Sequence, residues 1–262
     1  MNRSDLLTDI DVVNFLVNGY HLLKSNIPAQ LNAQIAKRLD TLEYNPGNAI
    51  SDVVPELWQV IQNPRVKGIL VSLLGKNYEV MGHRHWHCKH PKTNYMAWHQ
   101  DGTNNRDKGI DKLLGLYYPT NITAEMGPTI IVPGTQFRNA PTDRMATYTN
   151  IRGQVPMVLK AGTIAFTHYD LWHGTAANHT SIKRHMIKFL FRRVQDNDEP
   201  TWNHNPETMK TPTDWNGKSE NPRNILSFGN PLGVGQSDHY KERTIRWECW
   251  NKLLGVDNAF NT

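Results

Sequence analysis

The chain has 262 residues, of which 38% are hydrophobic and 20% charged, with two cysteines and a formal net charge of +5. This length is enough to bury a sizeable core, and the composition is that of a globular protein. Two cysteines are too few for a disulfide framework. No apolar run approaches the roughly 20 residues of a membrane helix, and the N-terminus has no signal-peptide pattern. We therefore expect a cytoplasmic protein with no membrane partner.

The basic charge has two explanations. A nucleic-acid surface is one, but Lys and Arg are scattered among acids without a strong basic run, so we do not expect nucleic acid as a partner. A basic pocket for an anionic small molecule explains the charge as well. A basic adaptor protein, the alternative, would bind with a strong salt dependence. The sequence does not indicate the oligomeric state.

Residues 1–77 are predicted to be mostly helical, because apolar residues recur there every three or four positions. The predicted helices cover residues 8–18, 28–45, 55–62 and 66–74, and a short strand is predicted at 19–23. Pro28 and Pro55 stand at helix starts, where a missing N–H costs nothing. Gly75 follows the last of these helices as a stop signal.

Residues 78–194 change to short β-branched and aromatic segments punctuated by Gly and Pro. The candidate strands are 78–89, 94–99, 113–119, 128–132, 155–159, 163–166, 171–175 and 185–194. About eight short strands without helical spacers predict a double-sheet jelly roll, so the expected fold class is mainly β with flanking α.

Residues 195–262 form a polar extension that ends in a predicted helix at 242–254. Because this extension holds Trp202 and Trp215, we expect it to pack on the jelly-roll core. We predict a single domain over residues 1–262.

The most informative stretch is Trp98-His99-Gln100-Asp101. Residues two apart on a strand point to the same side, so His99 and Asp101 can converge on one point. His173, on a short apolar segment, is the candidate for a third ligand if its strand belongs to the same barrel. Two His and one carboxylate, with the other positions open, are the ligand set of non-heme Fe(II) oxygenases.

Arg184 lies eleven residues beyond His173, on a segment that would return beside it. A guanidinium pointing into a barrel needs an anion, because a buried unpaired charge is very costly. A dicarboxylic acid that chelates the metal at one end would supply that anion at the other, and Arg grips a carboxylate with two hydrogen bonds.

Several motifs, taken together, resemble the phytanoyl-CoA dioxygenase family in order and rough spacing. They are His99-x-Asp101, Glu125-Met126-Gly127-Pro128, Val132-Pro133-Gly134-Thr135, His173-x-Thr175-x-x-Asn178 and Arg184. Phe15-x-x-x-Gly19-Tyr20 and Leu73-Leu74-Gly75 also look like the family, so the resemblance covers roughly residues 10–194. Members are Fe(II)- and 2-oxoglutarate-dependent oxygenases with a double-stranded β-helix (jelly-roll, cupin-like) core.

The resemblance implies iron ligation by His99, Asp101 and His173. It implies that Arg184 binds the distal carboxylate of 2-oxoglutarate, with Thr175 and Tyr117 as further contacts. The implied reaction uses O2, releases succinate and CO2, and most often hydroxylates a small molecule.

The chain departs from the family at two positions. Gln136 stands where the family often has His, and Met96 stands where some members have Gln, which puts a cosubstrate contact there in doubt. Because the ligand Asp101 is retained, the halogenation carried out by some relatives is disfavoured.

Three alternating histidines, His83, His85 and His87, share one face of a predicted strand. A zinc site is one interpretation, but ligands on the same strand splay apart. We favour a substrate pocket lined by one or two of them, with His85 and His87 as the candidates and the rest exposed. Arg106, in the loop 103–112, could bind an anionic substrate there, or that loop could be an ordinary solvated one. The alternative to an enzyme is a non-catalytic jelly-roll protein that binds a metal or another ligand.

Overall fold

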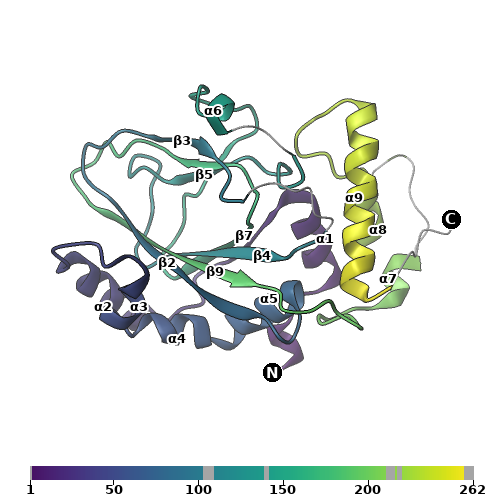
Figure 1. The fold of residues 1–262 in the computed structure, drawn as a ribbon, viewed down its shortest axis with the longest axis horizontal. Coiled ribbons are helices and arrows are strands. Elements are labelled where there is room, and N and C mark those ends of the chain that lie inside the picture. Colours follow the sequence, from purple (N-terminus) through teal and green to yellow (C-terminus); the bar gives the residue numbers. More distant parts are fainter. Residues whose placement is uncertain (1, 103–108, 139–141, 211–215, 217–219, 257–262) are drawn as a thin grey trace.

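The computed structural model describes residues 2–102, 109–138, 142–210, 216 and 220–256. Two antiparallel sheets lie face to face, and helices flank them (Figure 1). The strands are β1 (Tyr20–Leu23), β2 (Glu79–Lys89), β3 (Met96–His99), β4 (Lys112–Tyr118), β5 (Thr129–Ile131), β6 (Val155–Pro156), β7 (Thr163–His168), β8 (His173–Thr175) and β9 (Arg184–Arg192). The larger sheet has the order β1-β7-β4-β9-β2, and the smaller has the order β3-β8-β5-β6.

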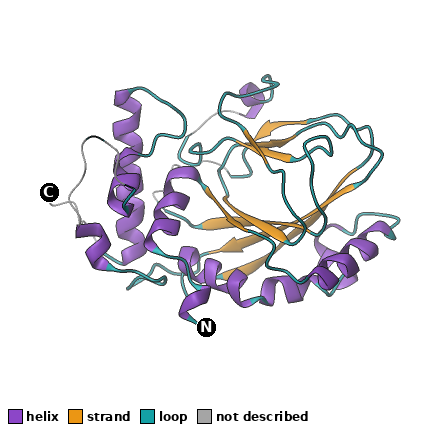
Figure 2. Ribbon diagram, turned by 180° about the vertical axis from the view of Figure 1, so that it is seen from behind, coloured by secondary structure: helices purple, strands orange, loops and turns teal. Residues whose placement is uncertain are grey.

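Most helices gather at two places around the sheets. The helices are α1 (Asp9–Asn18), α2 (Ala29–Asp40), α3 (Ile50–Val53), α4 (Leu57–Gln62), α5 (Pro64–Leu74), α6 (Thr142–Met145), α7 (Pro206–Lys210), α8 (Pro222–Phe228) and α9 (Gln236–Leu254). Helices α2 to α5 lie below the five-stranded sheet, and α1, α8 and α9 lie together at one end of it (Figures 1 and 2). Helix α6 lies apart, beside β3 (Figure 1).

The side chains of β9 alternate between two hydrophobic cores, one on each face of the five-stranded sheet. Ile187, Phe189 and Phe191 point outward, into the large hydrophobic cluster between the five-stranded sheet and the helices. Met186 and Leu190 point inward, into a smaller cluster that lies between the two sheets. This alternation follows from the period of two in a strand. Polar side chains on the inward face of β9 are therefore directed at the space between the sheets.

The predicted arrangement of helices and strands is largely observed, with differences in the helices. The predicted helix at 55–62 begins at Leu57, and α3 precedes it as a separate turn. The C-terminal helix begins at Gln236 instead of residue 242, because its first two turns are almost entirely polar and show no apolar stripe. Helices α6, α7 and α8 are four to seven residues long and were not expected from the sequence.

The C-terminal extension packs on α1 through α8 and α9, and one buried carboxylate of α1 adds hydrogen bonds to it. Asp9 accepts hydrogen bonds from Trp202 Nε1 at 2.6 Å, His204 Nδ1 and Thr208 Oγ1 at 2.8 Å, and the Asn205 backbone N–H at 2.9 Å. Asp9 is only 4% exposed. We refer to these five residues as the Asp9 cluster. Its closed hydrogen bonding stabilises the contact between residues that are almost 200 positions apart.

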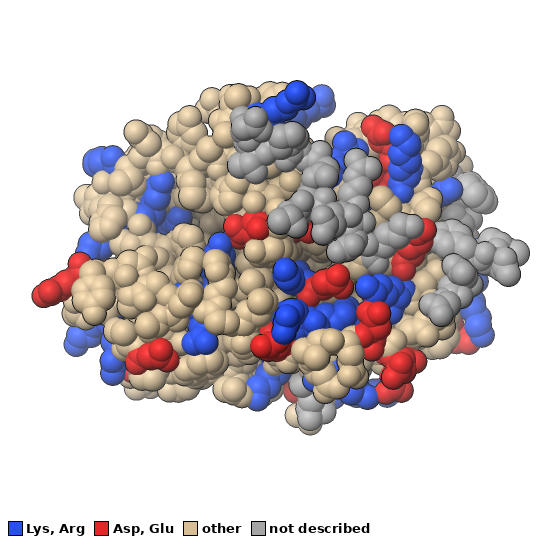
Figure 3. Space-filling model, viewed as in Figure 1, with Lys and Arg blue, Asp and Glu red and all other residues tan. Residues whose placement is uncertain are grey.

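No helix in the described part of the chain is long and apolar enough to span a membrane. On the face drawn in Figure 3, lysines and arginines lie in separate groups, and toward one end they alternate with acids.

Candidate metal centre and carboxylate pocket

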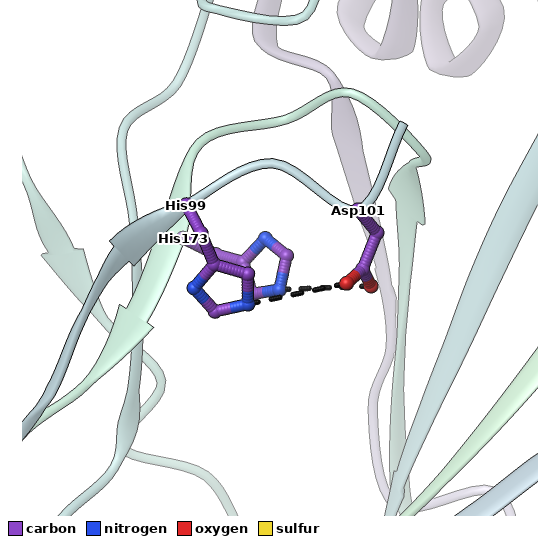
Figure 4. A group of neighbouring side chains, drawn as sticks. All are labelled: His99, Asp101 and His173. Carbon is purple, nitrogen blue, oxygen red and sulfur yellow. Dashed lines mark ion pairs between the residues drawn. The ribbon is translucent and has the colours of Figure 1, made fainter. Parts of the chain in front are cut away.

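Strands β3 and β8 bring three potential metal ligands together. The strands pair antiparallel with His99 opposite His173, and Asp101 follows two residues after His99. Nε2 of His99 lies 3.9 Å from Oδ1 of Asp101, and Nε2 of His173 lies 3.8 Å from Oδ2. One ligand atom from each residue lies within 4.8 Å of the other two. The two rings and the carboxylate point toward one another (Figure 4).

Backbone carbonyls set the tautomer of both imidazoles. Nδ1 of His99 lies 2.9 Å from the Ala97 carbonyl, and Nδ1 of His173 lies 2.9 Å from the Leu171 carbonyl. A carbonyl can only accept, so each Nδ1 carries the hydrogen. In a neutral ring this leaves a lone pair on Nε2, the atom that faces Asp101. Orientation of a ligating imidazole through its second nitrogen is typical of protein metal sites.

The electrostatics of the centre favour the protonation states that a metal requires. Burial and the neighbouring His99 lower the pKa of His173 to about 4. Burial alone would raise the pKa of Asp101, but His173 and Lys188 outweigh it and hold that pKa below its ordinary value. At neutral pH the carboxylate is therefore charged and the His173 ring is neutral, as metal binding requires.

Arg184 lies deeper between the sheets, at the start of β9. It is 2% exposed, and its Nε and Nη1 have no hydrogen-bond partner among the described residues. Tyr118 is close enough to influence the pKa of this guanidinium, and its hydroxyl donates to Thr129 Oγ1 at 3.0 Å. Thr129 pairs across the sheet with Thr175. Buried donors without a partner are costly, so this pocket fits a carboxylate.

Tyr117 is not brought to this pocket. Its hydroxyl donates to Asn32 Oδ1 at 2.6 Å, and the ring belongs to the large cluster between the five-stranded sheet and the helices. The adjacent Tyr118 points to the opposite face of β4 and is the tyrosine that lies near Arg184. The period of a strand predicts which residues alternate but not which set faces inward, so the sequence alone does not distinguish Tyr118 from Tyr117.

The three histidines of β2 line the inward face beside the metal centre. His85 pairs with Lys188 and His87 with Met186 across β2 and β9. The ring centroids of His83 and His85 are 4.0 Å apart. Burial lowers the pKa of all three, that of His87 to about 3. Within the described residues their ligand atoms do not form a convergent group of three, unlike those of the centre above.

Two residues of the site were missed and one prediction cannot be placed. Lys188 contacts Asp101, with Nζ 2.9 Å from Oδ2. It lies four residues after Arg184 and so on the same face of β9, a parity that the sequence did display. Tyr118 was missed because the period of a strand does not show which set of residues faces inward. Arg106 lies outside the described residues.

Two histidines and one aspartate with convergent ligand atoms match the ligand set of two-His, one-carboxylate metal proteins. A family model described as phytanoyl-CoA dioxygenase matches residues 18–186. The chain belongs to this family, as the motifs indicated. A search of curated proteins found no match.

Solved structures share the fold at low sequence identity. HygX from Streptomyces hygroscopicus, crystallised with nickel and 2-oxoglutarate, is 15% identical with a TM-score of 0.61, over 74% of this chain and 89% of HygX. The carbocyclase SnoK from nogalamycin biosynthesis is 18% identical with a TM-score of 0.58, over 74% of this chain and 87% of SnoK. The epimerase SnoN from the same biosynthesis is 18% identical with a TM-score of 0.55, over 69% and 80%. The predicted jelly-roll fold is confirmed, with two sheets that do not close into a barrel.

Proposed function

We propose that this protein is an Fe(II)- and 2-oxoglutarate-dependent dioxygenase that hydroxylates a small molecule. The observation that carries the proposal is the pairing of two features in one inter-sheet space. One is a convergent His99–Asp101–His173 group, and the other is the buried, unpartnered guanidinium of Arg184. A metal alone would explain the first feature, and only an additional anion explains the second.

The residues divide between iron and cosubstrate. His99, Asp101 and His173 would hold the iron, which when bound supplies the O2 chemistry that turns 2-oxoglutarate into succinate and CO2. Arg184 would bind the distal carboxylate with two hydrogen bonds, assisted by Thr175 and Tyr118. Arg184 and Lys188 stand roughly 13 Å apart along β9 at ~3.3 Å per residue. Because Lys188 contacts Asp101, this separation approximates the distance from Arg184 to the metal centre. It suits a five-carbon diacid together with the ion that it chelates.

Hydroxylation is the reaction we propose within this class. The similar solved structures include an epimerase and a carbocyclase, so related folds also serve other outcomes. A non-catalytic jelly-roll protein is the alternative from another class, and it has no use for an open carboxylate pocket beside a metal centre. Product analysis separates these cases: hydroxylation adds one oxygen atom from O2 to the substrate.

The first experiment is an anaerobic titration of the metal-free protein with Fe(II) and then 2-oxoglutarate. We expect the weak visible charge-transfer band of a chelated keto acid, which a binding protein without this chemistry would not give. Aerobic succinate release, stimulated by a metabolite panel, then identifies the substrate.

The cosubstrate role of Arg184 is tested by Arg184→Gln. Each charge-assisted hydrogen bond is worth about 1.5–3 kcal/mol, so we expect the half-saturating 2-oxoglutarate concentration to rise about 100-fold or more. Fe(II) affinity should change far less. Arg192→Gln is the matched control, because Arg192 lies on the same strand but pairs with Glu79 at the surface. An unchanged dependence on 2-oxoglutarate in Arg184→Gln would exclude the role.

A further inference from the structure

Lys188 is a buried cation whose partner is also a proposed metal ligand. It is 7% exposed, and its Nζ lies 2.9 Å from Oδ2 of Asp101. Asp101 is the carboxylate with which Lys188 forms an ion pair among the described residues. The other carboxylate of this region, Asp170, lies 3.8 Å from His168. The charge of Lys188 is therefore balanced chiefly by Asp101.

Metal binding changes that balance. A divalent ion held by His99, Asp101 and His173 would attract the single negative charge of Asp101 more strongly than a monovalent ammonium does. Lys188 would keep its place on β9 but lose most of its counter-charge. A buried charge whose counter-charge is drawn to another cation is unfavourable. The loaded centre therefore favours a further anion near Nζ.

Among the described residues, the surroundings of Lys188 supply hydrogen-bond donors, and Asp101 is the carboxylate that pairs with it. His85 lies directly across from it on β2, and the ring of His83 is tilted against that of His85 with centroids 4.0 Å apart. Lys188 is close enough to lower the pKa of both rings, after the larger effect of burial. Both rings are thus neutral at physiological pH, and both residues are only partly buried.

We propose that His83, His85 and Lys188 form a binding site for an anionic group, a carboxylate or a phosphate, of the primary substrate. Lys188 provides the charge, and the two imidazoles provide N–H donors. The site lies beside the metal centre, whereas the carboxylate pocket lies at Arg184, four residues before Lys188 on β9. The inference rests on the proposed function, because it is the bound metal that draws the charge of Asp101 away.

The binding test uses protein loaded with Zn(II) and 2-oxoglutarate, which does not turn over. Ligand-observed NMR would measure the affinities of matched probes: short carboxylic acids against their amides, and sugar phosphates against the parent sugars. We expect an acid or a phosphate to bind at least tenfold more tightly than its neutral counterpart, and the two panels distinguish the two anions. Equal binding of charged and neutral probes, or no binding of any anion, would overturn the proposal.

Variants assign the preference to particular residues. We expect the best anionic probe to lose at least tenfold in affinity in Lys188→Met, to recover most of it in Lys188→Arg, and to lose severalfold in His85→Leu. His90→Leu is the matched control, because His90 follows the same strand but is exposed. An unaltered affinity in Lys188→Met and His85→Leu would contradict the assignment.

Because Lys188 also contacts Asp101, metal and 2-oxoglutarate binding must be measured in every variant. If Lys188→Met weakens 2-oxoglutarate as strongly as Arg184→Gln does, Lys188 serves the cosubstrate and the proposal fails. His85→Leu leaves the Asp101 contact in place and supplies an independent result. A wild-type protein that shows no charge-transfer band with Fe(II) and 2-oxoglutarate would instead refute the proposed function itself.

Discussion

Two carboxylates, the buried Asp9 and the partly buried Asp101, differ in how far their oxygens are engaged in hydrogen bonds. Asp9 receives four hydrogen bonds of 2.6–2.9 Å, so its oxygens are fully engaged. Asp101 has one such contact, to Lys188, while the nearest imidazole nitrogens stop at 3.8 and 3.9 Å. Those imidazoles turn their N–H groups to backbone carbonyls instead. A closed network stabilises the fold, whereas a convergent but open one is arranged for a ligand.

The same substitution at the two carboxylates gives the sharpest contrast. Asp101→Asn removes the charge of one proposed ligand, and we expect metal affinity to fall by more than the roughly 10–100-fold typical of residues that only support a ligand. Calorimetric titration with Ni(II) measures this. A variant that binds the metal normally would contradict the assignment of Asp101.

Asp9→Asn should affect stability and spare the metal. The amide offers one acceptor where four donors now converge, so we expect a loss of about 3 kcal/mol in the free energy of unfolding. Urea denaturation measures the loss. Ni(II) affinity, measured at a temperature where the variant is folded, should match that of the wild type. A loss of metal affinity equal to that of Asp101→Asn would remove the distinction between the two carboxylates.

A histidine beside the metal centre, His87, predicts that the folded protein loses stability at acidic pH. Burial, with Lys188 and Arg184, lowers the pKa of His87 from 6.5 to about 3 in the folded state. The unfolded state therefore binds the proton first, and stability falls as pH drops below 6.5 toward about 3. Between pH 6.5 and 5 this amounts to about 2 kcal/mol.

His87→Asn should reduce that loss by a similar amount in metal-free protein, measured by urea denaturation at the two pH values. His90→Asn, at an exposed position, should leave the wild-type loss unchanged. Identical pH profiles for the wild type and His87→Asn would show that His87 is not held neutral by its surroundings.

A smaller contrast lies within one strand. Tyr118→Phe removes a hydroxyl beside Arg184, and we expect the half-saturating 2-oxoglutarate concentration to rise severalfold. Tyr117→Phe removes the hydrogen bond to Asn32, which should cost about 1 kcal/mol of stability and leave 2-oxoglutarate binding unchanged. Steady-state succinate release and urea denaturation measure the two effects. The reverse pattern would restore Tyr117 to the cosubstrate pocket.

Sequence reasoning found the part of the site that local geometry encodes. His99 ends β3 and Asp101 lies in the bend two residues later, so the two side chains are held close together in the chain, and the spacing from His173 to Arg184 matched a family pattern. The structure brings the first three together and buries Arg184 nearby. The choice between Tyr117 and Tyr118 could not be made in the same way, since it depends on the register with β9, where Tyr117 lies opposite Ile187.

Long-range contacts were the least predictable feature. Nothing in the sequence connects Asp9 with Trp202, His204 or Thr208, because their meeting depends on the packing of the C-terminal extension against α1. Helices α7 and α8 were missed for a related reason, since helices of five and seven residues depend on tertiary packing more than on their own periodicity. The period of two places Lys188 on the same face of β9 as Arg184. Lys188 was nevertheless missed, because it belongs to no motif.

The most direct test is a crystal of the protein grown with Ni(II) and 2-oxoglutarate, with anomalous diffraction recorded at the nickel edge. The account predicts one strong anomalous peak bonded to Nε2 of His99, Nε2 of His173 and an oxygen of Asp101. It also predicts a chelated keto acid whose far carboxylate contacts Arg184. A nickel ion bound elsewhere, or a diacid absent from the Arg184 pocket, would contradict it.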